Sequence, residues 1–245
     1  MRIQAYITVL IAMALAFGFA TASEAQTMKN EMSLDARQQS IVTIAAFTAS
    51  GDLERLKPSL GEGLDSGLTV NEIKEILVQM YAYAGFPRSL NGMATFMAVL
   101  DERKAKGIND TQGRDATPVP PDLDRDAYGA RVRADLSGLD AIPQPAAWQK
   151  FSPIIDDFLK QHLFADIFAR DTLTHQEREL ATIAALANMS GTVGQLGFHL
   201  GAAMNTGLTE AQMHGFIETL RAKVGAPQAE DAQKVLLGVL AKRKP

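Results

Sequence analysis

The sequence predicts an all-α protein that contains two tandem copies of one helical unit. A segment of the first half recurs in the second half, and the apolar residues of each copy follow helical spacing. No run of alternating β-branched residues favours a sheet. The composition can supply a packed core, because 47% of the 245 residues are hydrophobic and only 21% are charged.

The internal repeat covers most of the chain. LDARQQSIVTIAAF in the first half returns as LTHQERELATIAAL in the second half, at an offset of 139 residues. After one inserted residue the offset is 140, and Ser66-Gly67-Leu68-Thr69 matches Thr206-Gly207-Leu208-Thr209. We therefore expect a first repeat over residues 33–106 and a second over residues 151–243, that is, two copies of a multi-helix unit rather than a solenoid.

Start and stop signals divide each copy into about four helices. Capping boxes, in which a hydroxyl and a carboxylate or amide satisfy the first amides of a helix, are present at Thr69-x-x-Glu72, Thr174-x-x-Glu177 and Thr209-x-x-Gln212. Glycines stand where a helix ends in a left-handed residue, at Gly67, Gly85, Gly207 and Gly225. The predicted helices span residues 34–50, 53–66, 69–84 and 87–105, then 174–189, 193–206, 209–224 and 227–242.

Residues 1–25 have the pattern of a secretory signal peptide. Arg2 precedes an uncharged, mostly apolar run that extends to Ala22, and small residues allow cleavage after Ala22 or Ala25. The run is long enough to anchor the chain instead, but a glycine interrupts it and no basic stop follows. We therefore expect an exported protein, periplasmic or secreted, that keeps no stable membrane anchor.

The segment between the copies has a different composition. Residues 107–150 collect prolines and glycines and predict an irregular connector, which we expect to be laid over the surface. The second repeat begins with an additional amphipathic helix over residues 151–170, whose apolar face we expect to pack on the second repeat. That face comprises Ile154, Ile155, Phe158, Leu159, Leu163 and Ile167.

Charge and cysteine content exclude several classes of function. The formal net charge is −4, without the basic surface that binding to nucleic acid requires. Because the chain has no cysteine, it cannot supply a thiolate metal site, an iron–sulfur cluster or a catalytic thiol. No metal-binding, phosphate-binding or dinucleotide-binding motif is present, so we expect neither a metal nor a cofactor.

The four histidines are the first candidates for acid–base chemistry. His162, His175 and His214 stand on predicted helices in positions that an ordinary core or surface residue would occupy. His199 is the exception, because it belongs to a group of motifs in the second copy. These motifs are Arg170-x-x-Leu173, Arg178-x-Leu180-x-Thr182-x-Ala184-x-Leu186, Leu196-x-x-His199 and Ala203-x-x-x-Gly207-x-Thr209.

These motifs resemble the pattern of the carboxymuconolactone decarboxylase family. The first copy carries the later part of the same pattern, in Glu72-Ile73-x-Glu75-Ile76-Leu77 and in Tyr81-Ala82-Tyr83-Ala84-Gly85-Phe86-Pro87. The resemblance implies a duplicated carboxymuconolactone decarboxylase or alkylhydroperoxidase D-like helical bundle. It also implies assembly with further copies of the chain, since relatives with this fold commonly form homo-oligomers.

The peroxidases of this fold use a glutamate, a pair of cysteines and a histidine. By resemblance the glutamate corresponds to Glu179 and the histidine to His199, whereas the cysteines have no counterpart in residues 190–196. Thiol peroxidase chemistry is therefore excluded, although a peroxiredoxin-type label could still be attached to the family as a whole.

The decarboxylases of the family act on a carboxylated unsaturated lactone and need no redox cofactor. Loss of CO2 leaves an enolate, so such a site needs a group that binds the carboxylate and an acid that returns a proton to carbon. The resemblance suggests His199 as that acid, with Glu179 to orient it, and Arg170 or Arg178 to bind the carboxylate. A structural role remains open for His199, and for the arginines it is favoured.

The first copy lacks both candidate catalytic groups, because Ser40 and Ser59 occupy the positions of Glu179 and His199. The two copies therefore look complementary. We hypothesise a single site that both copies build, to which the first copy contributes Tyr83, Glu75 or Arg88.

The leading prediction for function is a cofactor-free lyase or proton-transfer enzyme that acts on a small carboxylated, lactone-type metabolite. The alternative is a small-molecule-binding or scaffold protein that has kept the fold without catalysis, which the incomplete first copy and the expected export favour.

Overall fold

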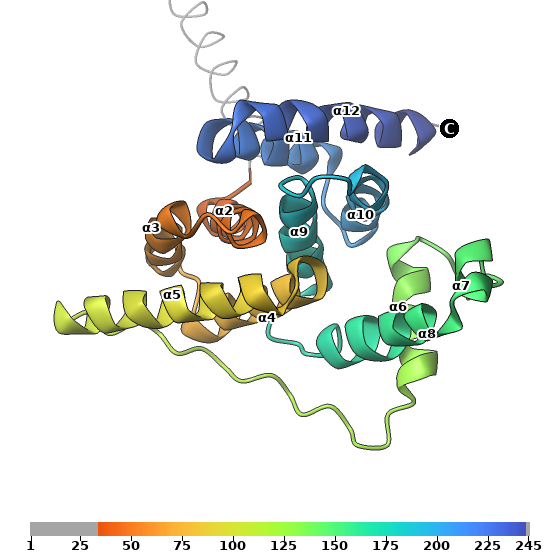
Figure 1. Ribbon diagram of the computed structural model, residues 1–245, viewed down its shortest axis with the longest axis horizontal. Coiled ribbons are helices and arrows are strands. Elements are labelled where there is room, and N and C mark those ends of the chain that lie inside the picture. The colour runs from red at the N-terminus through yellow and green to blue at the C-terminus, as the bar shows by residue number, and fades with distance from the viewer. Residues whose placement is uncertain (1–33, 244–245) are drawn as a thin grey trace, which may run out of the picture.

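The computed structural model describes residues 34–243, which form helices joined by loops and contain no β-strand (Figure 1). The predicted signal peptide, residues 1–25, lies outside the described residues. Within those residues, no helix combines the length and the apolar character that crossing a membrane would require. The all-α prediction is confirmed.

Both copies contain the four predicted helices, with ends that differ from the prediction by a few residues. The first copy comprises α2 (Ala36–Ser50), α3 (Leu53–Asp65), α4 (Val70–Ala84) and α5 (Phe86–Ala105). The second comprises α9 (His175–Leu186), α10 (Val193–Asn205), α11 (Glu210–Thr219) with its π-helical extension η2 (Leu220–Val224), and α12 (Ala226–Arg243).

Local sequence signals account for the helix ends. All three predicted capping boxes form, at the starts of α4, α9 and α11. Gly67, Gly85 and Gly207 have positive φ, whereas Gly225 has a φ of 170°. The prediction of a left-handed residue is therefore wrong at Gly225, because the π-helical turn of η2 delivers the chain into an extended conformation there.

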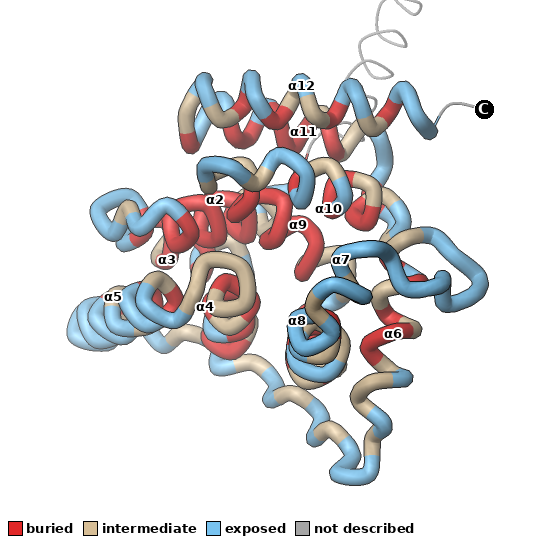
Figure 2. Tube along the Cα trace, turned by 45° about the vertical axis from the view of Figure 1, so that its right-hand side comes forward, coloured by how far each residue is buried: buried red, intermediate tan, exposed pale blue. Residues whose placement is uncertain are grey.

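The two copies interlock about a central pair of equivalent helices. α2 packs against α9, α4 of the first copy covers α9, and α11 with η2 of the second copy covers α2. Figure 2 shows α2 and α9 as almost entirely buried, while α5 and α12 lie on opposite outer sides with exposed faces. The single large core therefore joins residues of both copies, from Leu34 to Leu240.

The connector between the copies is more regular than its composition predicts. Residues 107–150 include helix α6 (Arg125–Leu136), which the sequence analysis missed. The buried positions of α6 include Gly129, Ala130 and Ala134, which are too small to produce an apolar stripe in the sequence. An ideal Cβ at Gly129 would lie 1.9 Å from the carbonyl oxygen of Lys160, so only glycine allows this close crossing.

The expected helix over residues 151–170 is divided and packs elsewhere. It consists of α7 (Ala147–Phe151), α8 (Pro153–Asp157) and the π-helix η1 (Phe158–Ile167), with Pro153 at the break. The buried residues of this segment and of α6 form a second, smaller core that packs against α4. The second repeat contributes only Ala202 of α10 to the buried residues of this core. The expectation that this segment packs on the second repeat is therefore wrong, and Ile154, Ile155 and Phe158 of its predicted face are exposed.

Candidate active site

The histidine singled out by the sequence lies beside the predicted glutamate. His199 on α10 and Glu179 on α9 approach to 2.7 Å between Nδ1 and Oε2. His199 is 6% exposed and Glu179 is fully buried. When Nδ1 donates to the carboxylate, the neutral imidazole has its lone pair on Nε2, so Glu179 fixes both the tautomer and the orientation of the ring. The other carboxylate oxygen of Glu179 is buried without a hydrogen-bond partner among the described residues.

Tyr83 supplies the group that faces the free nitrogen of His199. It comes from α4 of the first copy, and its hydroxyl lies 3.5 Å from Nε2 of His199. The two rings meet edge to face, with centroids 5.3 Å apart. Burial, and secondarily the charge of Glu179, raise the pKa of Tyr83 well above its usual value. The phenol therefore stays protonated and can donate its hydrogen to Nε2.

A buried ion pair connects α9 to α4, about two helical turns from Tyr83 along α4. Arg178 of α9 is fully buried, and its Nη2 donates to Oε1 of Glu75 on α4 at 2.8 Å. Arg170, which follows η1, donates from Nε to both oxygens of Glu75 at 3.0 and 3.1 Å. Burial lowers the pKa of Arg178, and the ion pair with Glu75 opposes this shift. Two guanidinium groups therefore share one carboxylate.

Two buried polar residues that the sequence analysis missed join the ion pair to the region of Tyr83. Arg178 Nη1 donates to the side-chain oxygen of Gln79 at 2.9 Å, and the amide of Gln79 donates to the Thr182 hydroxyl at 3.1 Å. Glu75, Gln79 and Tyr83 follow one another at intervals of four on α4, which places them along one face of the helix. This spacing is the signal that could have identified Gln79.

Of the three first-copy residues in the hypothesis of a shared site, the structure brings Tyr83 and Glu75, but not Arg88, together with the candidate residues of the second copy. The first two face His199 and Arg178, respectively. The guanidinium of Arg88 instead lies about 4.0 Å from an ideal Cβ built on Gly51, at the end of α2, and no hydrogen bond or ion pair joins it to the cluster among the described residues. Arg88 stands at the start of α5, beyond the turn at Gly85, and its side chain follows the α2 side of that helix.

Two segments of the chain, residues 10–96 and 153–237, match the model of the carboxymuconolactone decarboxylase family. Together they cover more than half of the sequence. The chain belongs to the carboxymuconolactone decarboxylase family. A comparison with curated proteins found no match. The two family segments contain the two groups of helices that interlock, so that both contribute to the polar cluster around His199 and Arg178.

A second histidine of this family member also takes part in a polar chain, which the sequence analysis did not foresee. Nε2 of His162 lies 3.0 Å from the Tyr81 hydroxyl, and its Nδ1 lies 3.0 Å from Asp166, which in turn accepts from Arg125 at 2.6 Å. Burial would raise the pKa of Asp166, but the hydrogen bonds from Arg125 and His162 outweigh it and lower the pKa. About half of the His162 side chain is exposed, so this row of hydrogen-bonded side chains lies at the surface of the protein.

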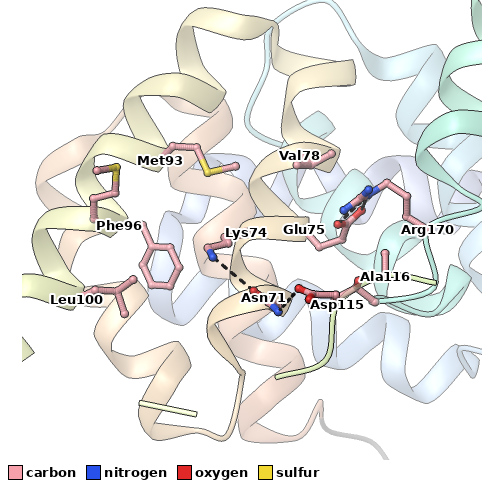
Figure 3. Close-up of a pocket in the computed structure, with 12 residues that line it drawn as sticks. Asn71, Lys74, Glu75, Val78, Met93, Phe96, Leu100, Asp115, Ala116 and Arg170 are labelled. Atoms are coloured by element: carbon pink, nitrogen blue, oxygen red, sulfur yellow. Dashed lines mark hydrogen bonds and ion pairs between the residues drawn. The ribbon is translucent and has the colours of Figure 1, made fainter. Parts of the chain in front are cut away.

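Within residues 34–243, no group of three potential metal ligands gathers. A pocket of about 420 Å³ opens beside Glu75 and Arg170 (Figure 3). His199 does not line this pocket. The buried His199–Glu179 pair and the pocket thus lie at opposite ends of the Glu75–Gln79–Tyr83 row of α4, with Tyr83 at His199 and Glu75 at the pocket.

Proposed function

We propose that this protein is a cofactor-free lyase or proton-transfer enzyme that acts on a small carboxylated, lactone-type metabolite. His199 would be the acid that transfers the proton, Glu179 would orient it, and Tyr83 would hold Nε2. The 2.7 Å contact between a fully buried carboxylate and Nδ1 of His199 carries the proposal, because it prepares an imidazole whose second nitrogen is directed at a single phenol.

The proton balance of such a reaction is simple. When the bond between the substrate carbon and its carboxylate breaks, CO2 leaves and the electron pair enters the conjugated carbonyl as an enolate. Before this step Nε2 of His199 takes up a proton from solvent, and the Tyr83 oxygen then accepts from it instead of donating to it. The imidazolium gives that proton to carbon from Nε2, and the neutral ring takes up another from solvent for the next cycle. Glu179 lowers the cost of the positive charge on the ring throughout, since it stays within hydrogen-bond distance of Nδ1.

The two arginines have different roles in this proposal. Arg178 is fully buried and engaged by Glu75 and Gln79, so it positions α4 against α9 rather than binding substrate. The side chain of Arg170 is 42% exposed and remains available to a carboxylate. Export of the protein and assembly with further copies are parts of the same proposal, and they rest on the sequence pattern and the family resemblance.

The test is release of CO2 from a panel of carboxylated lactones by the purified protein. We expect His199→Ala and His199→Gln to lower kcat/KM by about 10²- to 10⁴-fold, the range of a lost general acid. His214→Ala is the matched control, because His214 lies on α11 of the same copy with an exposed side chain. Turnover that survives both His199 substitutions would refute the assignment of the site.

A second candidate function is ligand binding without catalysis. The observation that favours it is the pocket of about 420 Å³ beside Glu75, which His199 does not line. If no lactone in the panel is turned over while a carboxylate binds to the protein, this candidate replaces the enzyme.

A further inference from the structure

The pocket beside Glu75 is built from four separate segments of the chain. α4 and α5 form its two long walls, the connector crosses one side through Asp115 and Ala116, and the segment after η1 closes it with Arg170 and Thr172. Figure 3 shows Arg170 and Glu75 at one end and the side chains of Phe96 and Leu100 at the other. The volume of about 420 Å³ lies within the range of small-molecule sites.

The charged end of the pocket offers unused hydrogen-bond donors. Arg170 binds Glu75 through Nε alone, and its two terminal nitrogens have no hydrogen-bond partner among the described residues. Lys74 also lines the pocket, and its ammonium has only one long contact, 3.4 Å to the side-chain oxygen of Asn71. A guanidinium with two parallel donors fits the geometry of a carboxylate.

Glu75 at this end of the pocket is already paired with two guanidinium groups. Glu75 is neutralised twice, by Arg170 at 3.0 Å and by the buried Arg178 at 2.8 Å. Asp115 is the other carboxylate of the lining, and it accepts a hydrogen bond from Asn71 at 3.0 Å. The charged side chains that line the pocket are Lys74 and Arg170 against Glu75 and Asp115, and their formal charges cancel. An anion would therefore be recognised through the unpaired terminal nitrogens of Arg170 rather than through a net charge of the pocket.

The opposite end of the pocket is apolar. Val78 of α4 and Met93, Phe96, Met97 and Leu100 of α5 form its surface. Met97 is 66% exposed and lies at the mouth of the pocket. A molecule that satisfies both ends has a carboxylate head and a short apolar body.

The connector wall is held rigidly in place. Asn71 donates from its side chain to the carbonyl oxygens of Gly113 and Arg114, and its backbone amide donates to Gln112 at 3.0 Å. Further along, Thr117 donates from its amide and its hydroxyl to Asp171, each at 2.8 Å. These contacts fix the connector on both sides of Asp115 and Ala116, so the pocket exists before a ligand arrives.

We propose that the pocket between α4 and α5 binds a small amphiphilic carboxylate, whose head is held by Arg170 and Lys74 and whose apolar body lies along Met93, Phe96 and Leu100. His199 does not line this pocket, and Gln79 and Tyr83 lie between Glu75 and the His199 contact along α4. The inference rests on the proposed function in one residue, Arg170, which is offered to a carboxylate in both. It goes beyond the proposed function in the place and the apolar body of the ligand, and it holds whether or not His199 is catalytic.

The experiment is calorimetric titration of the full protein with octanoate, octanol and octylamine as probes. Saturable binding of octanoate is expected, with octanol at least about tenfold weaker because it lacks the charged head. Octylamine should bind least, since its ammonium would face Arg170 and Lys74. Binding of octanoate should weaken as the salt concentration rises.

Substitutions locate the site. Arg170→Gln should weaken octanoate binding by about tenfold or more, and Lys74→Gln should weaken it less, since Lys74 is exposed at the mouth. Arg131→Gln is the matched control, because the side chain of Arg131 is 38% exposed on α6 and outside the pocket. Met97→Glu places a negative charge at the mouth without touching the ion pair, so it tests the site even if Arg170→Gln fails to fold.

Three results would overturn the inference. The first is equal affinity for octanoate and octanol, or no saturable binding of octanoate at all. The second is octanoate binding that Lys74→Gln and Met97→Glu leave unchanged. The third is loss of octanoate binding in His199→Gln, which would place the ligand in the other site. If His199→Gln loses turnover of the lactones but binds octanoate normally, both the catalytic proposal and the binding proposal are supported. If no form of the protein turns over a lactone, the catalytic proposal fails, and the binding proposal is decided by the octanoate titrations alone.

Discussion

At the scale of single residues, Arg178 shows how the buried cluster depends on each of its members. Its guanidinium is fully buried, with Glu75 and Gln79 as its side-chain acceptors and the carbonyl oxygen of Arg170 as its backbone acceptor. The desolvation cost of a buried charge is offset only while the charge keeps its partners, so loss of its counter-ion is strongly unfavourable. The pair with Glu75 is therefore a matter of stability as well as of site geometry.

Glu75→Gln tests this dependence. We expect the free energy of unfolding to fall by about 3–5 kcal/mol, because Arg178 would stay buried without a counter-ion. Urea denaturation measures the change, with Glu102→Gln as the control, since the ion pair of Glu102 with Lys57 is exposed and contributes little. Replacing both charged residues, as in Glu75→Leu with Arg178→Met, should recover much of the loss. Equal effects of the Glu75 and Glu102 substitutions would contradict the argument.

His175 gives the folded protein a dependence on pH. Burial lowers the pKa of His175, against the hydrogen bond of its Nε2 with the carbonyl oxygen of Phe168 at 3.3 Å, which raises it. The folded protein therefore binds fewer protons here than the unfolded chain, whose histidine titrates near pH 6.5. The free energy of unfolding should accordingly fall as the pH drops below about 6.5, and this contribution is complete above that value.

His175→Asn removes the titrating group and keeps a donor for Phe168. Urea denaturation at several values between about pH 5 and 7 should show a shallower dependence on pH in the variant than in the original protein. An identical slope in both would mean that His175 does not titrate differently in the folded and unfolded states.

Sequence reasoning reached His199, Glu179, Tyr83 and Glu75 because each stands in a recognisable motif. It missed Gln79 and Thr182, which are ordinary residues until α4 is known to cover α9, and it misplaced Arg88, because a motif does not say to which side of a turn a side chain points. The positions of Gln79, Thr182 and Arg88 depend on contacts between segments that are distant in the sequence. Such contacts leave no local signal in the sequence.

At the scale of elements, the same limit applies to α6 and η1. The repeated helices follow capping boxes and apolar stripes, and the sequence predicts them almost to the residue. α6 has no such stripe, because its contact with η1 depends on small residues that allow the two backbones to approach. Composition alone therefore suggested an irregular connector where a helix is present.

Gly129→Ala tests the close crossing of α6 and η1. An ideal Cβ would lie 1.9 Å from the backbone oxygen of Lys160, which cannot move aside as a flexible side chain would. We expect a loss of about 1–3 kcal/mol in the free energy of unfolding, with faster hydrogen exchange confined to α6 and η1. Gly238→Ala on α12, where nothing lies within 4 Å, should instead stabilise the protein by about 0.5–1 kcal/mol. A gain at both positions would show that helix propensity outweighs the close crossing at Gly129.

At the scale of the whole molecule, neither copy can bury its own central helix. α2 depends on α11 and η2 of the second copy, and α9 depends on α4 of the first. The core runs continuously from one copy to the other, so a separated copy would expose much of the apolar surface that stabilises it. The duplication thus produces one folding unit rather than two domains joined by a linker.

Division of the chain in the exposed loop between α6 and α7 tests this unity. One fragment would end at Ile142 and the other would begin at Pro143, so that each copy keeps all of its own helices. Produced alone, each fragment should lack a cooperative thermal transition and should aggregate, because α2 or α9 is uncovered. Produced together, the fragments should associate, with the helical content of the intact protein by circular dichroism and a single transition. A fragment that folds cooperatively as a monomer would show that the central pair of helices joins two independent domains after all.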